Sequence, residues 1–87
     1  MNIFIAVPTE SNPALRSRIE SEFPSDSYAL PNGEWLIAFG GTTKELSDRL
    51  GVSQGQCGAA VVLSVANYWG FADKNLWEWI AVKEKQA

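Results

Sequence analysis

Apolar residues along this chain fall into four short β-prone runs. Residues 3–7 are too uniformly apolar for a strand with one wet face, so we expect this strand in the middle of a sheet. Residues 27–30 and 35–39 flank the segment 31–34, whose Asn-Gly pair is typical of a tight turn between adjacent antiparallel strands. Residues 59–65 have small to medium apolar side chains and predict a fourth strand, in a sheet interior covered by helices.

Three other segments carry helix signals. The first spans residues 13–23 and starts at the N-cap residue Asn12. The second follows a capping box formed by Thr42 and Glu45, and the third runs from the N-cap residue Asp73 to about residue 85. The apolar stripes of the first two helices are Leu15, Ile19 and Phe23, and Leu46 and Leu50, and the residues that end these helices are Pro24 and Gly51.

This order of elements predicts an α+β fold. We expect a ferredoxin-like βαββαβ sandwich, in which a four-stranded antiparallel sheet packs on two helices, with a short C-terminal helix added. We expect a single domain over residues 1–87, because a chain of this length buries only roughly 60–65% of its unfolded surface and needs every large apolar side chain for one core.

Charge and composition restrict the partners and the compartment. The net charge is −3, and the seven basic residues are dispersed, so we do not expect nucleic acid as a partner. No apolar run approaches the roughly 20 residues that cross a bilayer, so we expect no membrane span. The single cysteine, Cys57, permits no internal disulfide, and the chain opens on a strand-like run rather than a signal peptide. We therefore expect a cytoplasmic protein.

Residues with catalytic chemistry are scarce. The chain has no histidine, which removes the usual general base, the Ser-His and Cys-His nucleophile pairs and the commonest metal ligand. Without a histidine partner, Cys57 is interpreted as a structural thiol. Gly40 and Gly41 precede a helix but lack the Lys-Ser/Thr ending of a phosphate-binding loop. We expect no cofactor.

Three carboxylates lie near predicted strand ends or turns, at Glu10, Glu34 and Asp73. Two acids that converge at one sheet end could hold Mg²⁺ together with phosphate oxygens. The N-cap explains Asp73 and the turn explains Glu34, which leaves Glu10 as the candidate metal ligand.

The segment TTKELSDRLGVS, residues 42–53, is similar to the first helix and turn of a helix-turn-helix motif. A true motif would continue into a recognition helix with basic residues. Here no Lys or Arg occurs between Leu50 and Ala72, and an apolar run follows. We therefore interpret residues 42–51 as an ordinary capped helix.

Half of the chain's ten aromatic residues lie within twelve positions near the C-terminus. Trp77 and Trp79 project about 200° apart on a helix, so we expect one of them to be exposed. Exposed Trp and Tyr favour an interface with a partner or a second copy. In the alternative interpretation these rings complete a small core from two sides. The candidate contact residues are Tyr68, Trp69, Phe71, Trp77 and Trp79.

The order of elements and the segments WLIAF, TTKELSDRLG and AAVVLSV resemble small bacterial ferredoxin-like proteins of the VapD and CRISPR-adaptation-nuclease kind. The resemblance implies homodimers formed through sheets or C-terminal segments. It also implies, for some members, metal-dependent nuclease activity with an acidic residue at the end of the first strand. In this chain that strand end reads IFIAVPTE, with Pro8 and Thr9 in place of an aspartate.

These observations predict a non-enzymatic, homodimeric protein that binds through its C-terminal aromatic surface to a second copy or to another protein. One alternative is a Mg²⁺-dependent nuclease, active or degenerate, with Glu10 as a ligand. Another is a small acidic inhibitor that occupies a basic site on a different protein.

Overall fold

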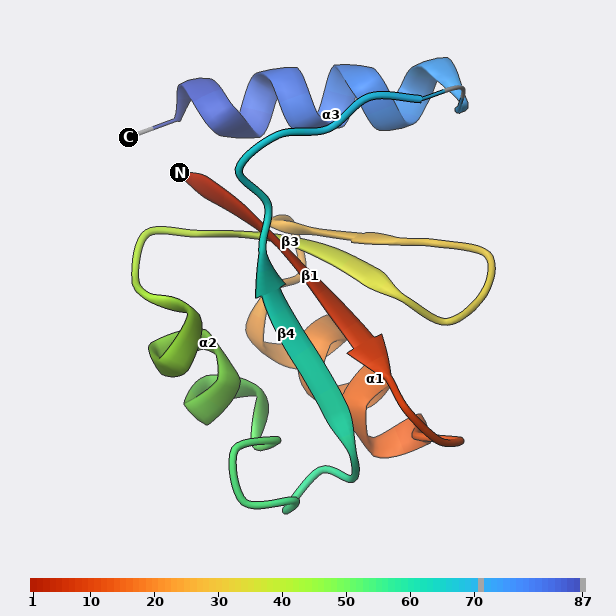
Figure 1. The fold of residues 1–87 in the computed structure, drawn as a ribbon, viewed down its shortest axis with the longest axis vertical. Coiled ribbons are helices and arrows are strands. Elements are labelled where there is room, and N and C mark those ends of the chain that lie inside the picture. The colour runs from red at the N-terminus through yellow and green to blue at the C-terminus, as the bar shows by residue number, and fades with distance from the viewer. Residues whose placement is uncertain (71, 87) are drawn as a thin grey trace.

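The computed structural model describes residues 1–70 and 72–86, and the elements within these residues follow the predicted order (Figure 1). The α+β class and the four-stranded antiparallel sheet expected from the sequence are confirmed. The elements are β1 (Asn2–Pro8), α1 (Pro13–Glu22), β2 (Ser27–Ala29), β3 (Trp35–Phe39), α2 (Thr43–Leu50), β4 (Ala60–Ser64) and α3 (Lys74–Lys85).

The strand order across the sheet is β2-β3-β1-β4, and every neighbouring pair is antiparallel. β1 therefore lies between β3 and β4, which confirms the central position predicted for residues 3–7. Because β3 is antiparallel to both β1 and β2, these two strands run parallel to each other with β3 between them. By the same reasoning, β3 and β4 run parallel with β1 between them. The sheet thus consists of two interleaved β-α-β units.

β4 is an edge strand, so the prediction that residues 59–65 lie in a covered sheet interior is wrong (Figure 1). Among the described residues, β4 pairs with β1 alone, and the side chains of Val61 and Leu63 are 46% and 49% exposed. The apolar composition of the run resembles that of a buried strand. Strand order, however, is decided by which strand pairs with each side of β1, and composition does not report that.

One face of the sheet packs against α1 and α2; in Figure 1, α1 lies behind the strands and α2 is seen to the left of β4. Phe4 and Ala6 of β1 and Ile37 of β3 point to this side. Phe4 and Ala6 do so together because alternate residues of a strand share a face. Phe23 follows α1 and packs edge-on against Phe39, with ring centroids 5.9 Å apart. The predicted stripes of the two helices are all buried in this cluster: Leu15, Ile19, Phe23, Leu46 and Leu50.

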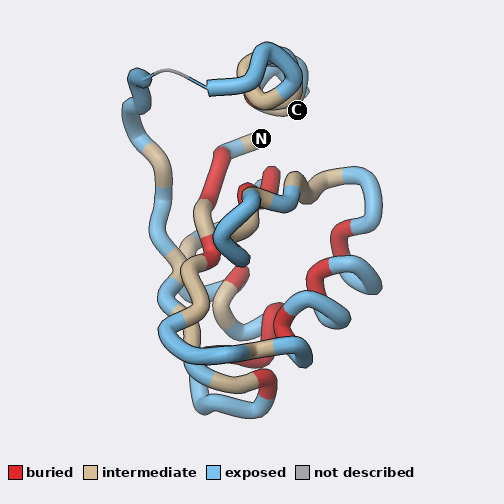
Figure 2. Tube along the Cα trace, turned by 90° about the vertical axis from the view of Figure 1, so that its right-hand side faces the viewer, coloured by how far each residue is buried: buried red, intermediate tan, exposed pale blue. Residues whose placement is uncertain are grey.

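The opposite face of the sheet meets α3, which crosses one end of the strands (Figures 1 and 2). Ile3, Leu36 and Ala38 from the sheet bury Ile80, which is the buried residue of α3. Lys83 adds an ion pair to Asp26 at 2.9 Å, between α3 and the segment before β2. Most of α3 is exposed or half-buried, so it covers only part of this face (Figure 2).

Both ends of α2 follow the sequence signals. Thr42 Oγ1 accepts a hydrogen bond from the Glu45 N–H at 3.1 Å, and the Thr42 N–H donates to Glu45 Oε1 at 3.0 Å. Gly51 ends the helix at φ 73°, and a Cβ there would lie 2.9 Å from Cys57 Sγ. The Cys57 N–H donates to the Gly51 carbonyl at 2.7 Å, and the thiol is buried. Cys57 therefore packs the turn, as expected for a structural thiol.

After α2 the chain passes through a loop, residues 51–59, directly into β4. The segment 42–53 therefore lacks the recognition helix of a helix-turn-helix motif, as predicted. Among residues 1–70 and 72–86, no helix combines the length and the apolar character needed to cross a membrane.

We predict that Ile80→Ala lowers the free energy of unfolding by about 2–4 kcal/mol, because it removes the buried anchor of α3 and leaves a cavity. Urea denaturation followed by circular dichroism measures the change. The matched control is Val82→Ala on the same helix, whose side chain is 56% exposed and whose effect should stay within about 0.5 kcal/mol. Equal effects of the two substitutions would contradict this packing of α3.

Candidate functional site

The aromatic residues between β4 and α3 include the most exposed side chains of the predicted contact set. Trp69 is 100% exposed and Tyr68 is 36% exposed. Both belong to the segment of residues 65–70, which leaves β4 and leads towards α3 (Figure 1). Phe71, also predicted as a contact residue, lies outside the described residues.

Tyr68 attaches this segment to α3. Its ring stacks on that of Trp77, with centroids 6.0 Å apart and planes inclined by 19°. Its hydroxyl donates a hydrogen bond to Glu84 Oε1 at 2.5 Å. Trp77 and Glu84 are seven residues apart, so they lie on one side of the helix, two turns from each other. Tyr68 is therefore held at both its ring and its hydroxyl, next to Trp69.

The expectation that either Trp77 or Trp79 lies exposed is wrong, because both are half-buried against the α3 cluster. They do project apart, as predicted. Trp77 meets Tyr68, whereas Trp79 meets Tyr28 of β2 at a centroid distance of 5.8 Å. Each indole is thus partly covered by a tyrosine ring, from the connection after β4 for Trp77 and from β2 for Trp79. The two indoles hold α3 on the sheet, in agreement with the alternative interpretation for these two rings.

Trp69 has a different environment. Together with Asn67, Tyr68, Gly70 and Trp77 it lines a half-open depression of about 500 Å³. Since no part of the Trp69 side chain is buried, folding gains nothing from its large apolar area. We define the aromatic patch as Tyr68, Trp69 and Trp77.

A second exposed apolar surface lies on β4 and was missed by the sequence interpretation. Val61 and Leu63 pair with Val7 and Ile5 of β1, so all four side chains point to the face that carries α3. α3 lies over the other end of that face, which explains the exposure of Val61 and Leu63. The sequence shows that β4 is apolar, but it does not show which of its side chains lack a covering element.

Four exposed side chains of these surfaces, Val61, Leu63, Tyr68 and Trp69, belong to a stretch without charges, whereas Trp77 lies on α3. No Asp, Glu, Lys or Arg occurs from Leu50 to Ala72, and we refer to residues 50–72 as the uncharged segment. It contains the loop before β4, the whole of β4 and the connection to α3. Charges are depleted at the centres of protein interfaces.

The three candidate carboxylates are not part of any cluster of three or more metal-ligating residues among the described residues. Glu10 is exposed and lines a cleft together with Asn12 and Arg16. Asp73 accepts a hydrogen bond from the Asn75 N–H at 3.0 Å, which confirms its predicted role as the N-cap of α3. Within the described parts of the chain, no group of three or more Asp, Glu or Cys residues is arranged to hold a metal ion.

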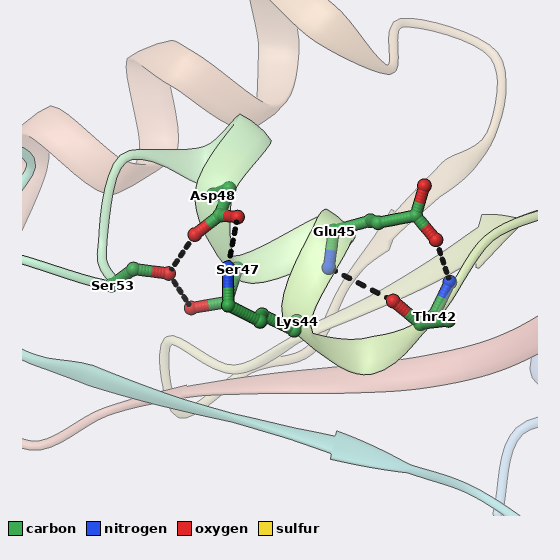
Figure 3. A network of polar contacts seen from close by, with 6 residues as sticks. All are labelled: Thr42, Lys44, Glu45, Ser47, Asp48 and Ser53. Carbon is green, nitrogen blue, oxygen red and sulfur yellow. Dashed lines mark hydrogen bonds and ion pairs between the residues drawn. The ribbon is translucent and has the colours of Figure 1, made fainter.

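A polar network at the C-terminal end of α2 contains the residue types of a nucleophile and a base (Figure 3). The Ser53 hydroxyl donates to Asp48 Oδ1 at 2.5 Å and lies 2.9 Å from Ser47 Oγ. Lys44 donates to Asp48 Oδ2 at 3.0 Å. The hydrogen bond from Ser53, and then that from Lys44, lowers the pKa of Asp48. A carboxylate with a lowered pKa is a weak base, so this network stabilises the turn rather than activating Ser53.

Most basic side chains are engaged within the protein. Ion pairs join Arg16 to Glu20, Lys44 to Asp48, Arg49 to Glu22, Lys74 to Glu78 and Lys83 to Asp26. Arg49 also lies over the rings of Phe23 and Phe39, at 5.0 and 5.8 Å from their centroids. Arg18 donates to the Arg49 carbonyl at 3.1 Å. The contacts of Arg18 and Arg49 connect α1 with α2, so both of these arginines have a structural role.

Comparison of the chain with protein-family models, with curated proteins and with solved structures gives no match. The functional argument therefore depends on the residues of this chain. The residues that point most clearly to a function are those of the aromatic patch and the exposed side chains of β4.

We predict that Tyr68 titrates above its ordinary pKa of 10.0, because its hydrogen bond to Glu84 stabilises the neutral phenol and the nearby carboxylate opposes the phenolate. A pKa that folding raises adds stability below the pKa of the unfolded tyrosine, and this stability is lost as the pH rises through the folded-state pKa. Glu84→Gln should lower the pKa of Tyr68.

Tyrosinate absorbance during alkaline titration measures this pKa, and Tyr68→Phe identifies which of the two tyrosines gives the transition. An unchanged titration in Glu84→Gln would contradict the hydrogen bond between Tyr68 and Glu84.

Proposed function

We propose that this protein is a non-enzymatic, homodimeric interaction module that makes contact through its aromatic patch. The full exposure of Trp69 is the observation that carries the proposal. Burying a large apolar side chain contributes about 1.5–3 kcal/mol, and Trp69 makes that contribution only when a partner covers it. Trp and Tyr are also the residues on which binding energy concentrates in interfaces.

The shape and the charge of this region favour a protein partner. The depression beside Trp69 is about half open to solvent, whereas sites for small molecules enclose most of their ligand. Tyr68 and Trp69 lie within the uncharged segment, so this part of the patch brings no charged side chain of its own to a second copy despite the net charge of −3.

The same residues argue against catalysis. The chain has no histidine, and the network of Ser53, Asp48 and Lys44 stabilises a turn with a carboxylate of lowered pKa. Glu10, the candidate ligand of a nuclease metal, shares its cleft with Arg16, whose positive charge opposes a cation.

We also infer a ferredoxin-like sandwich for the fold and a cytoplasmic location. Two interleaved β-α-β units and the order β2-β3-β1-β4 support the fold, with α1 and α2 on one sheet face and α3 as an addition on the other. The single buried thiol of Cys57 suits a reducing compartment.

We predict that Trp69→Ala weakens self-association at least about tenfold, which corresponds to about 1.4 kcal/mol. Sedimentation velocity over a concentration series measures the association. The circular dichroism spectrum should stay unchanged, because the exposed indole adds nothing to the folded subunit. Val82→Ala, which removes an exposed apolar side chain from α3, is the matched control. A wild-type chain that stays monomeric at high micromolar concentration, or a Trp69→Ala variant that associates normally, would overturn the proposal.

A further inference from the structure

The backbone of β4 has donors and acceptors on its free edge. Two hydrogen bonds show which residues of β4 point their backbone groups towards β1. The Thr9 N–H donates to the Ala59 carbonyl at 3.2 Å, and the Val65 N–H donates to the Ile3 carbonyl at 2.9 Å. In an antiparallel pair the bonded residues alternate with unbonded ones, so residues 59, 61, 63 and 65 bond to β1. The backbone groups of the three residues between them point away from the sheet: Ala60, Val62 and Ser64.

The two edges of the sheet differ in their protection. β2, at one edge, has three residues and lies between Pro24 and Pro31. Short strands, prolines and charged residues keep edges from pairing with other chains. β4, at the other edge, is longer, and the uncharged segment around it contains neither a proline nor a charge. Within residues 1–70 and 72–86, no hydrogen bond from outside the sheet reaches the outward groups of β4.

We propose that a second copy of this chain pairs with this edge, β4 against β4, antiparallel and centred on Val62. In this register the outward groups of Ala60 meet those of Ser64 in the partner, and the two Val62 residues face each other across the two-fold axis. The two sheets become one continuous sheet. The inference rests on the proposed homodimer and names the backbone contact that forms it.

Self-complementarity favours a second copy over an unrelated strand. Pairing about Val62 places Val61 opposite Leu63 of the partner subunit, in the unbonded positions where side chains come closest. Val61 and Leu63 are the two exposed large apolar residues of β4, so each covers the other. A two-fold interface also brings every charge near the axis close to its own copy. The uncharged segment spans residues 50–72, and its midpoint lies next to Val62.

The same register connects the strand with the aromatic patch. In an antiparallel pair, the chain that follows β4 in one copy runs beside the chain that precedes β4 in the other. Trp69 follows β4, and residues 51–59 precede it, and both stretches are uncharged. The aromatic patch therefore extends the interface beyond the paired strands.

Amide hydrogen exchange, followed by NMR at low and high protein concentration, tests the pairing. The amides of Ala60, Val62 and Ser64 should exchange rapidly in the monomer and at least about tenfold more slowly in the dimer, because only the dimer provides their acceptors. The amides of Val61 and Leu63 bond to β1 and should be protected at both concentrations. They are the internal control.

Paired charge variants test the register. Val61→Lys/Leu63→Lys and Val61→Glu/Leu63→Glu should each associate at least about tenfold more weakly than wild type, since like charges meet across the axis. An equimolar mixture of the two variants should regain association. Val82→Lys on α3 is the control for added charge and should associate like the wild type.

The outcomes separate this inference from the proposed function. A dimer that depends on Trp69 but leaves the amides of Ala60, Val62 and Ser64 unprotected would overturn the β4 pairing and leave the proposed homodimer standing. A wild-type chain that is monomeric at every concentration would overturn both. Protection of these amides only when another polypeptide is added would replace the second copy with a foreign strand.

Discussion

The structure depends on hydrogen bonding along both sides of β1. Because β1 pairs with β3 on one side and with β4 on the other, each of its side chains points to a fixed face of the sheet, either towards α1 and α2 or towards α3. Phe4 and Ala6 thereby enter one cluster, and Ile3 enters the other. A shift of one residue in register would exchange the two sets and expose the core of the first face. The same pairing leaves β4 with a neighbour on one side only.

A chain of this length does not cover both faces of its sheet equally. α1 and α2 complete the first face with a continuous set of fully buried aliphatic and aromatic side chains. On the second face α3 contributes one buried residue, Ile80, and relies on half-buried indoles and the Lys83–Asp26 ion pair for the rest of its contact. Val61 and Leu63 lie beyond its reach. The uncovered side chains, the free edge of β4 and the exposed Trp69 all fall within one uncharged segment, and this coincidence is the physical basis of the proposal that the protein binds a partner.

Much of the fold was predictable because its signals are local. Asn12, Thr42 with Glu45, Gly51 and Asp73 mark helix ends through hydrogen bonds within a few residues, and these predictions are confirmed. The hairpin between β2 and β3 was predictable for the same reason, since Gly33 supplies the positive φ of 96° that its Asn-Gly pair indicated.

The candidate site was less predictable, because exposure depends on contacts between distant segments. The sequence identified Trp77 and Trp79 as pointing apart, but it did not reveal that Tyr68 and Tyr28 would cover them. The apolar run of β4 gave no indication of its edge position, which follows from the pairing of β1 with β3. Trp69 was among the predicted contact residues, and its exposure distinguishes it from the two tryptophans of α3.

The central claim is that the uncharged segment presents apolar side chains to water in the isolated subunit. Paramagnetic relaxation by a soluble, uncharged probe, measured by NMR on dilute protein, tests it most directly. The account predicts strong relaxation of the Trp69 indole and of the Val61 and Leu63 methyl groups, and weak relaxation of the indoles of Trp77 and Trp79 and of the Ile80 methyl groups. Protection of Trp69 and Leu63 equal to that of Ile80 would contradict it.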